Sequence, residues 1–142
     1  MSYKNEFTDE EWLILESAPL WILAIVGGID GNIDKKEISV FTDKVISIAS
    51  SSFSLTREVF QDVIANIATV INTPTNGETA IKGLLVVNSL LEKVDATEAK
   101  HFKESLIFLG NEISEASGSI FKKRSDQETK ALALLAKMFD LI

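Results

Sequence analysis

Apolar residues recur at helical spacing along nearly the whole chain, and no stretch shows the period-two alternation typical of a β-strand. Ile38, Phe41, Val45 and Ile48, for example, fall on one face of a helix. Only 2 of the 142 residues are proline, so few points force a helix to stop. We therefore expect an all-α fold, a compact bundle of about seven helices with antiparallel neighbours and no strands.

Capping residues and turn signals divide the chain into the expected helices. Thr8 and Glu11 form a capping-box pattern at the first helix, and Pro19 predicts a break followed by a new helix to about Ile29. The sequence NTPTNG, residues 72–77, is the clearest loop. The remaining helices are expected to begin near Asp34, Ser54, Glu78, Asp95 and Ser125.

Two of these helices carry specific predictions. Residues 54–71 are expected to form one helix, because the apolar residues from Phe60 to Ile71 share a face. In the next helix, the residues expected to point inward are Ile81, Leu84, Leu85 and Leu91.

Composition and charge limit the classes of function. Hydrophobic residues make up 46%, enough for the core of one domain spanning residues 1–142. The absence of cysteine excludes disulfides, thiolate zinc sites and thiol catalysis. The net charge of −7 offers no basic footprint for nucleic acid. No signal segment is visible, and the apolar run Leu20–Ile29 is shorter than the roughly 20 residues that span a membrane. A cytoplasmic protein without direct membrane insertion is expected.

The stretch GGIDGNIDKKE, residues 27–37, resembles the second half of an EF-hand calcium loop. With Glu37 at the twelfth position, Asp30 and Asp34 fall at the fifth and ninth, where oxygen ligands belong, and a glycine falls at the sixth. The first and third positions are then valine and glycine, which cannot bind a cation through their side chains. An ordinary EF-hand is therefore not expected, although the three acids suit another site for a hard cation such as calcium.

The same acids also have a structural interpretation. Asp34 can cap a helix with Glu37 as its capping-box partner, and the same pattern recurs at three other expected helix starts, which favours capping. Asp95 and Glu98 form a second acidic pair between two helices, and a cap is the favoured interpretation there too. If the fold brings this pair beside the first turn, the two could share a cation.

His101 is the only histidine, so a histidine-rich metal site cannot form, and no catalytic triad is expected around it. A surface or partly buried structural role is expected for it. Trp12, Trp21 and Phe53 could mark an interaction surface, but aromatic residues at helical spacing more often belong to the core.

A weak internal repeat and two longer segments suggest a family. The turn at Asp30 and Gly31 has a counterpart near Ser117 and Gly118, each followed by a capped helix. The segment EEWLILESAPLWILAIVGGIDGNIDKKEI, residues 10–38, resembles the opening of TerB-like tellurite-resistance proteins. The segment EAKHFKESLIFLGNEISEASGSIFKKRSDQE is similar to a later part of that family. The resemblance covers most of the chain.

The resemblance implies a fold of about seven helices with internal pseudo-symmetry and a non-enzymatic role in metal or chemical stress. It also implies metal binding through acidic residues and protein partners in larger, often membrane-associated, assemblies. The acids that correspond to the family motif are Asp30, Asp34 and Glu37, with Asp95 and Glu98 as weaker counterparts. Ser117 departs from the pattern, since many relatives have an acid in that turn.

Three functions compete at this point. The first is a TerB-like interaction module that binds a divalent cation. The second is a purely structural or scaffolding domain, which can form a homo-oligomer and in which every acid named above is a cap. The third is a small enzyme that uses paired carboxylates, which the sequence does not favour because no acid–base pair is recognisable.

Overall fold

The computed structural model describes residues 2–27, 35–117 and 126–141. These residues contain a 3-10 helix, η1, seven α-helices and no strand, so the all-α prediction is confirmed. The elements are η1 (Tyr3–Glu6), α1 (Asp9–Val26), α2 (Lys35–Ile48), α3 (Ser54–Ala65), α4 (Ile67–Asn72), α5 (Gly77–Leu91), α6 (Ala96–Ser117) and α7 (Asp126–Met138).

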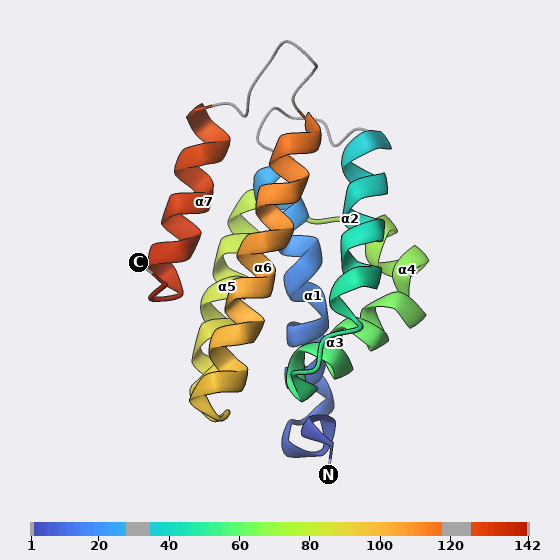
Figure 1. Ribbon diagram of the computed structural model, residues 1–142, viewed down its shortest axis with the longest axis vertical. Helices are drawn as coiled ribbons and strands as arrows, with labels where there is room; N and C mark the ends of the chain where they lie inside the picture. The colour runs from blue at the N-terminus through green and yellow to red at the C-terminus, as the bar shows by residue number, and fades with distance from the viewer. Residues whose placement is uncertain (1, 28–34, 118–125, 142) are drawn as a thin grey trace.

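Helix α1 lies at the centre of the bundle, with α5 and α6 packed along it and α2 and α7 on either side (Figure 1). Ten of its 18 residues are buried, and they cover most of its circumference. A helix that is apolar nearly all round is stable only when neighbours cover it on several sides. The central position of α1 therefore follows from its sequence.

Glycine permits close approach at two contacts between helices. A Cβ atom added at Gly83 of α5 would lie 2.5 Å from the ring of Trp21 on α1. A Cβ at Gly110 of α6 would lie 2.7 Å from Leu132 on α7. Both distances are shorter than carbon atoms tolerate, so a side chain at either position would force the neighbouring side chain to shift.

The predicted break at Pro19 is wrong, because α1 continues through this residue to Val26. Proline inside a helix removes one backbone hydrogen bond and costs about 3 kcal/mol. The residues on both sides of it are buried, and each large apolar side chain taken from water contributes roughly 1.5–3 kcal/mol. Burial of the whole segment therefore outweighs the local cost.

The predicted single helix over residues 54–71 is also wrong, because α3 ends at Ala65 and α4 begins at Ile67. Asn66 interrupts the helix with φ −117° and ψ 22°, and its side-chain amide donates to the carbonyl of Asp62 at 3.0 Å. Asparagine competes for backbone groups in this way and favours a helix end. The predicted boundary at Pro19 is absent, and an unpredicted boundary lies at Asn66. The described residues therefore still form seven α-helices, but with different divisions.

The inward face of α5 differs from the prediction at two positions. Leu84 and Leu91 are buried as expected, but Ile81 and Leu85 are 43% and 49% exposed. The buried residues of α5 are Ala80, Leu84, Val87, Leu90 and Leu91. Gly83 faces Trp21 of α1, so the buried residues next to Gly83 face the core. Ile81 and Leu85 lie beside these buried residues.

Candidate functional site

The acidic turn is described only in part. Asp30 and Asp34 lie outside the described residues, as does most of the counterpart turn after Ser117. Glu37 lies in the first turn of α2 and is 2% exposed. A Cβ added at Gly27 would lie 3.0 Å from Oε2 of Glu37, so glycine at the end of α1 leaves room for this carboxylate.

Asp95 caps α6, which confirms the structural interpretation for this residue. Its carboxylate accepts hydrogen bonds from the backbone N–H groups of Thr97 at 3.1 Å and Glu98 at 3.2 Å. These donors have no partner within the first turn of a helix, and aspartate is among the residues best suited to satisfy them.

Glu98 is also a cap, but for a different helix. Its Oε1 accepts the backbone N–H of Leu55, the second residue of α3, at 2.8 Å. Phe53 occupies the N-cap position of α3 and supplies no side-chain acceptor. A carboxylate from α6 thus caps α3, a role that is normally taken by a residue at the start of the same helix.

The fold does not bring Glu37 close to Glu98. Glu37 lies at the start of α2, whereas Glu98 contacts the start of α3, just beyond the other end of α2 (Figure 1). A helix of 14 residues is about 21 Å long, which no single cation can bridge. Within the described ranges, no group of three or more acids or histidine is placed to hold a metal ion.

His101 is half-buried in a structural contact between α6 and the loop after α2. Its ring stacks on Phe53 with centroids 3.9 Å apart, and its Nε2 lies 3.0 Å from Oγ of Ser51. Ser51 Oγ already accepts the N–H of Phe53, so its hydroxyl is available to donate to the imidazole. This arrangement fixes the loop on α6, in agreement with the predicted structural role.

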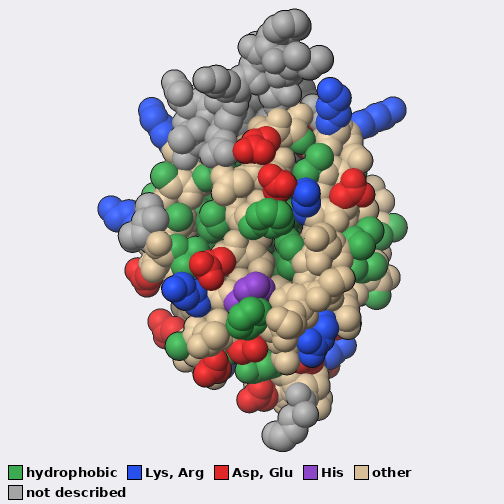
Figure 2. All heavy atoms as spheres, viewed as in Figure 1, with side chains coloured by type: hydrophobic (Ala, Val, Ile, Leu, Met, Phe, Trp, Pro, Cys, Tyr) green, Lys and Arg blue, Asp and Glu red, His purple; other side chains and the backbone are tan. Residues whose placement is uncertain are grey.

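The two tryptophans pack inward rather than forming an exposed surface. Trp12 is 3% exposed, and its indole N–H donates to Asp62 at 2.8 Å. Trp21 is half-buried against Gly83. Figure 2 shows acidic and basic side chains interspersed on one face of the molecule, with no continuous basic patch there.

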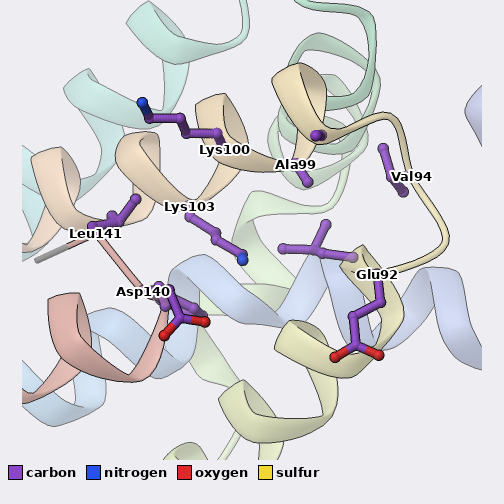
Figure 3. A pocket seen from close by; sticks show the side chains of 10 residues that line it. Glu92, Val94, Ala99, Lys100, Lys103, Asp140 and Leu141 are labelled. Atoms are coloured by element: carbon purple, nitrogen blue, oxygen red, sulfur yellow. The ribbon is translucent and has the colours of Figure 1, made fainter.

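A hollow that no sequence motif indicated lies between the α5–α6 turn, α6 and the end of α7. Its volume is about 410 Å³, and buried Leu91, Ala99 and Phe139 are among its apolar lining residues. The side chain of Lys103 extends toward its middle, between Asp140 and Glu92 (Figure 3). The lining thus combines apolar residues with two lysines and two acids.

The end of α7 shapes this hollow through an unusual backbone conformation. Asp140 has φ 58°, the left-handed conformation that aspartate tolerates better than most residues. The N–H of Leu141 then bonds to the carbonyl of Ala136 at 2.9 Å, which closes the helix and turns Leu141 toward the hollow. Only the aspartate at this helix end could have signalled the turn in the sequence.

The fold and its contacts define an all-α bundle in which Asp95 and Glu98, two of the five candidate acids, cap helices. No family model matches the chain, and no solved structure matches it. The chain is 32% identical over 143 residues to "Uncharacterized protein ORF11'" of Methanothermobacter thermautotrophicus. The alignment covers 99% of this chain and 94% of that protein. The chain belongs to the same family as this protein, whose description assigns no activity.

None of the helices in the described ranges has the length and apolar character needed to cross a membrane.

Proposed function

We propose that this chain is a non-enzymatic interaction module of the TerB-like kind that binds a divalent cation through the turn before α2. The observation that carries the proposal is the burial of Glu37, which is 2% exposed at the start of α2. Carboxylate oxygens are the ligands that a hard cation takes, and the same turn contributes Asp30 and Asp34 in the sequence.

The residues present fit a hard cation such as calcium. Glu37 supplies carboxylate oxygens, Gly27 leaves space beside them, and the turn that joins them contributes two more aspartates in the sequence. Binding there would tie the end of α1 to the start of α2. The family resemblance adds the expectation of protein partners in a larger, membrane-associated assembly that responds to metal or chemical stress.

Calorimetric titration with calcium and with manganese tests the cation site. We expect the wild type to bind, Glu37→Gln to weaken binding at least tenfold, and Glu98→Gln to leave binding unchanged. Glu98→Gln is the matched control, because Glu98 is also a first-turn acid but lies at the far end of the bundle. At a hundred times the dissociation constant, bound ion also stabilises the fold by about 2.7 kcal/mol. Absence of binding at millimolar ion, or equal binding by Glu37→Gln, would refute the site.

A structural domain without a cation is the second candidate. The capping bonds of Asp95 and Glu98 favour it, because they account for two of the five candidate acids without a metal. This alternative predicts that Glu37→Gln costs little stability and that neither ion raises the melting temperature. The same titration therefore decides between the two candidates.

A further inference from the structure

An apolar crevice opens to the surface between α5 and α7. It has a volume of about 250 Å³, and Ala24, Ile25, Ile81, Ala131 and Leu134 are among its lining residues. Leu134 is 63% exposed and Ile81 is 43% exposed, and Leu85 extends the apolar surface one turn along α5 at 49%. Large apolar side chains exposed together in this way indicate a contact surface.

Two lysines of α7 flank the crevice, although the whole chain carries a net charge of −7. Lys130 and Lys137 are exposed and lie four residues before and three residues after Leu134, on the same side of α7. On α5, Lys82 lies next to Ile81 and pairs with Glu78 at 3.1 Å. An occupant with acidic groups beside an apolar side chain would match the two lysines of α7.

The chain itself carries such a feature on another face. Leu13 of α1 is 60% exposed, with Asp9 and Glu10 one turn before it and Glu16 three residues after it. Leu13 and Glu16 border a hollow beside α4, and α4 and α7 lie on opposite sides of the bundle (Figure 1). Leu13 therefore cannot reach the crevice of its own molecule.

We propose that Leu13 of one copy inserts into the α5–α7 crevice of the next, so that the chain associates with itself head to tail. The crevice is large enough for one leucine side chain, and the acids around Leu13 then face the lysines around Leu134. Because two different surfaces meet, the contact is heterologous and continues into a ring or an open chain of copies. The contact identifies a second copy of the chain as a partner for the interaction module proposed above. Only the biological role of the contact rests on that proposal.

Sedimentation velocity between about 10 μM and 1 mM protein tests the contact. The wild-type mass is expected to rise with concentration, and to rise less at high salt, since exposed charges are screened. Leu13→Lys and Leu134→Glu place like charges in the contact, and each is expected to weaken association about 30-fold or more. Ile46→Lys is the control, because Ile46 is 51% exposed on α2 and belongs to neither surface.

Mixing the two variants gives the decisive measurement. Leu13→Lys retains an intact crevice and Leu134→Glu retains an intact Leu13, so an equimolar mixture is expected to associate through this one intact contact although neither variant associates alone. Circular dichroism checks that both are folded, and Leu13→Gln with Leu134→Gln repeats the test if a charged variant loses helix. A wild type that stays monomeric, variants that associate like the wild type, or a mixture that stays monomeric would each overturn the proposal. Cation binding is measured separately, so its failure is distinguishable from failure of this contact.

Discussion

Glu98 is expected to stabilise α3, although it belongs to α6. Its Oε1 accepts the N–H of Leu55 at 2.8 Å, and the N-cap residue of α3 provides no side-chain acceptor. Leu55 is fully buried, so water has poor access to the start of this helix. Glu98→Ala would therefore leave a helix-terminal donor without its acceptor.

The size of the loss follows from two contributions. Removing an N-cap acceptor costs about 0.5–2 kcal/mol, and removing an acid from the first turn of α6 costs about 0.3–1 kcal/mol more. We expect Glu98→Ala to lower the free energy of unfolding by about 2 kcal/mol, or the melting temperature by roughly 6–8 °C. Glu98→Gln keeps an oxygen acceptor and loses only the charge, so it should cost about 0.5–1 kcal/mol.

Urea unfolding followed by far-ultraviolet circular dichroism measures these differences directly. Glu104→Ala is the matched control, because Glu104 is exposed on the same helix. The cap assignment would be refuted if Glu98→Ala lost no more stability than this control. It would also be refuted if calcium restored stability lost in Glu98→Gln, since that would make Glu98 a ligand.

Two further stability measurements test the packing around α1. Gly83→Ala should lower the free energy of unfolding by about 1–2 kcal/mol, because overpacking against Trp21 exceeds the gain in helix propensity. Gly77→Ala, on the same helix but with open space around it, should instead stabilise by about 0.5 kcal/mol, and equal effects would refute the contact. Burial raises the pKa of Glu16 above its ordinary 4.5, with Asp62 contributing, so its charged form is disfavoured in the fold. Glu16→Gln should stabilise at pH 7, with a gain that vanishes as pH falls below 4.5; a gain independent of pH would contradict this.

The sequence predicts α2 and α6 well because their apolar periodicity and their core contacts agree. Phe41 and Val45, predicted on one face, are fully buried. The helix predictions at Pro19 and Asn66 are wrong for opposite reasons. At Pro19 burial of the surrounding helix overrides a local breaker, whereas at Asn66 local hydrogen bonding ends a helix that the apolar pattern would continue. Apolar periodicity alone cannot show whether burial or local hydrogen bonding decides at a given residue, because it contains no information about what covers each face of the helix.

The surface hollows escape sequence reasoning for a related reason. Lys103, Phe139 and Glu92 are distant in the chain and meet only after three elements have packed. The charges around Leu13 and Leu134 are visible in the sequence as helical spacings, but their meaning depends on both leucines being exposed. A charge beside a buried leucine is ordinary, whereas the same charge beside an exposed one can select a partner.

Three acids occupy the same position in the first turn of their helices, but their contacts in the fold differ. Glu11 closes its own capping box by accepting the N–H of Thr8 at 2.9 Å. Glu98 instead reaches across to α3, and Glu37 is buried beside the end of α1. The first two accept a backbone N–H, and both remain accessible to water. Glu37 is 2% exposed, and of the three it is the acid most enclosed by the fold. For this reason the test of a cation site centres on Glu37, and the other two acids serve as internal comparisons.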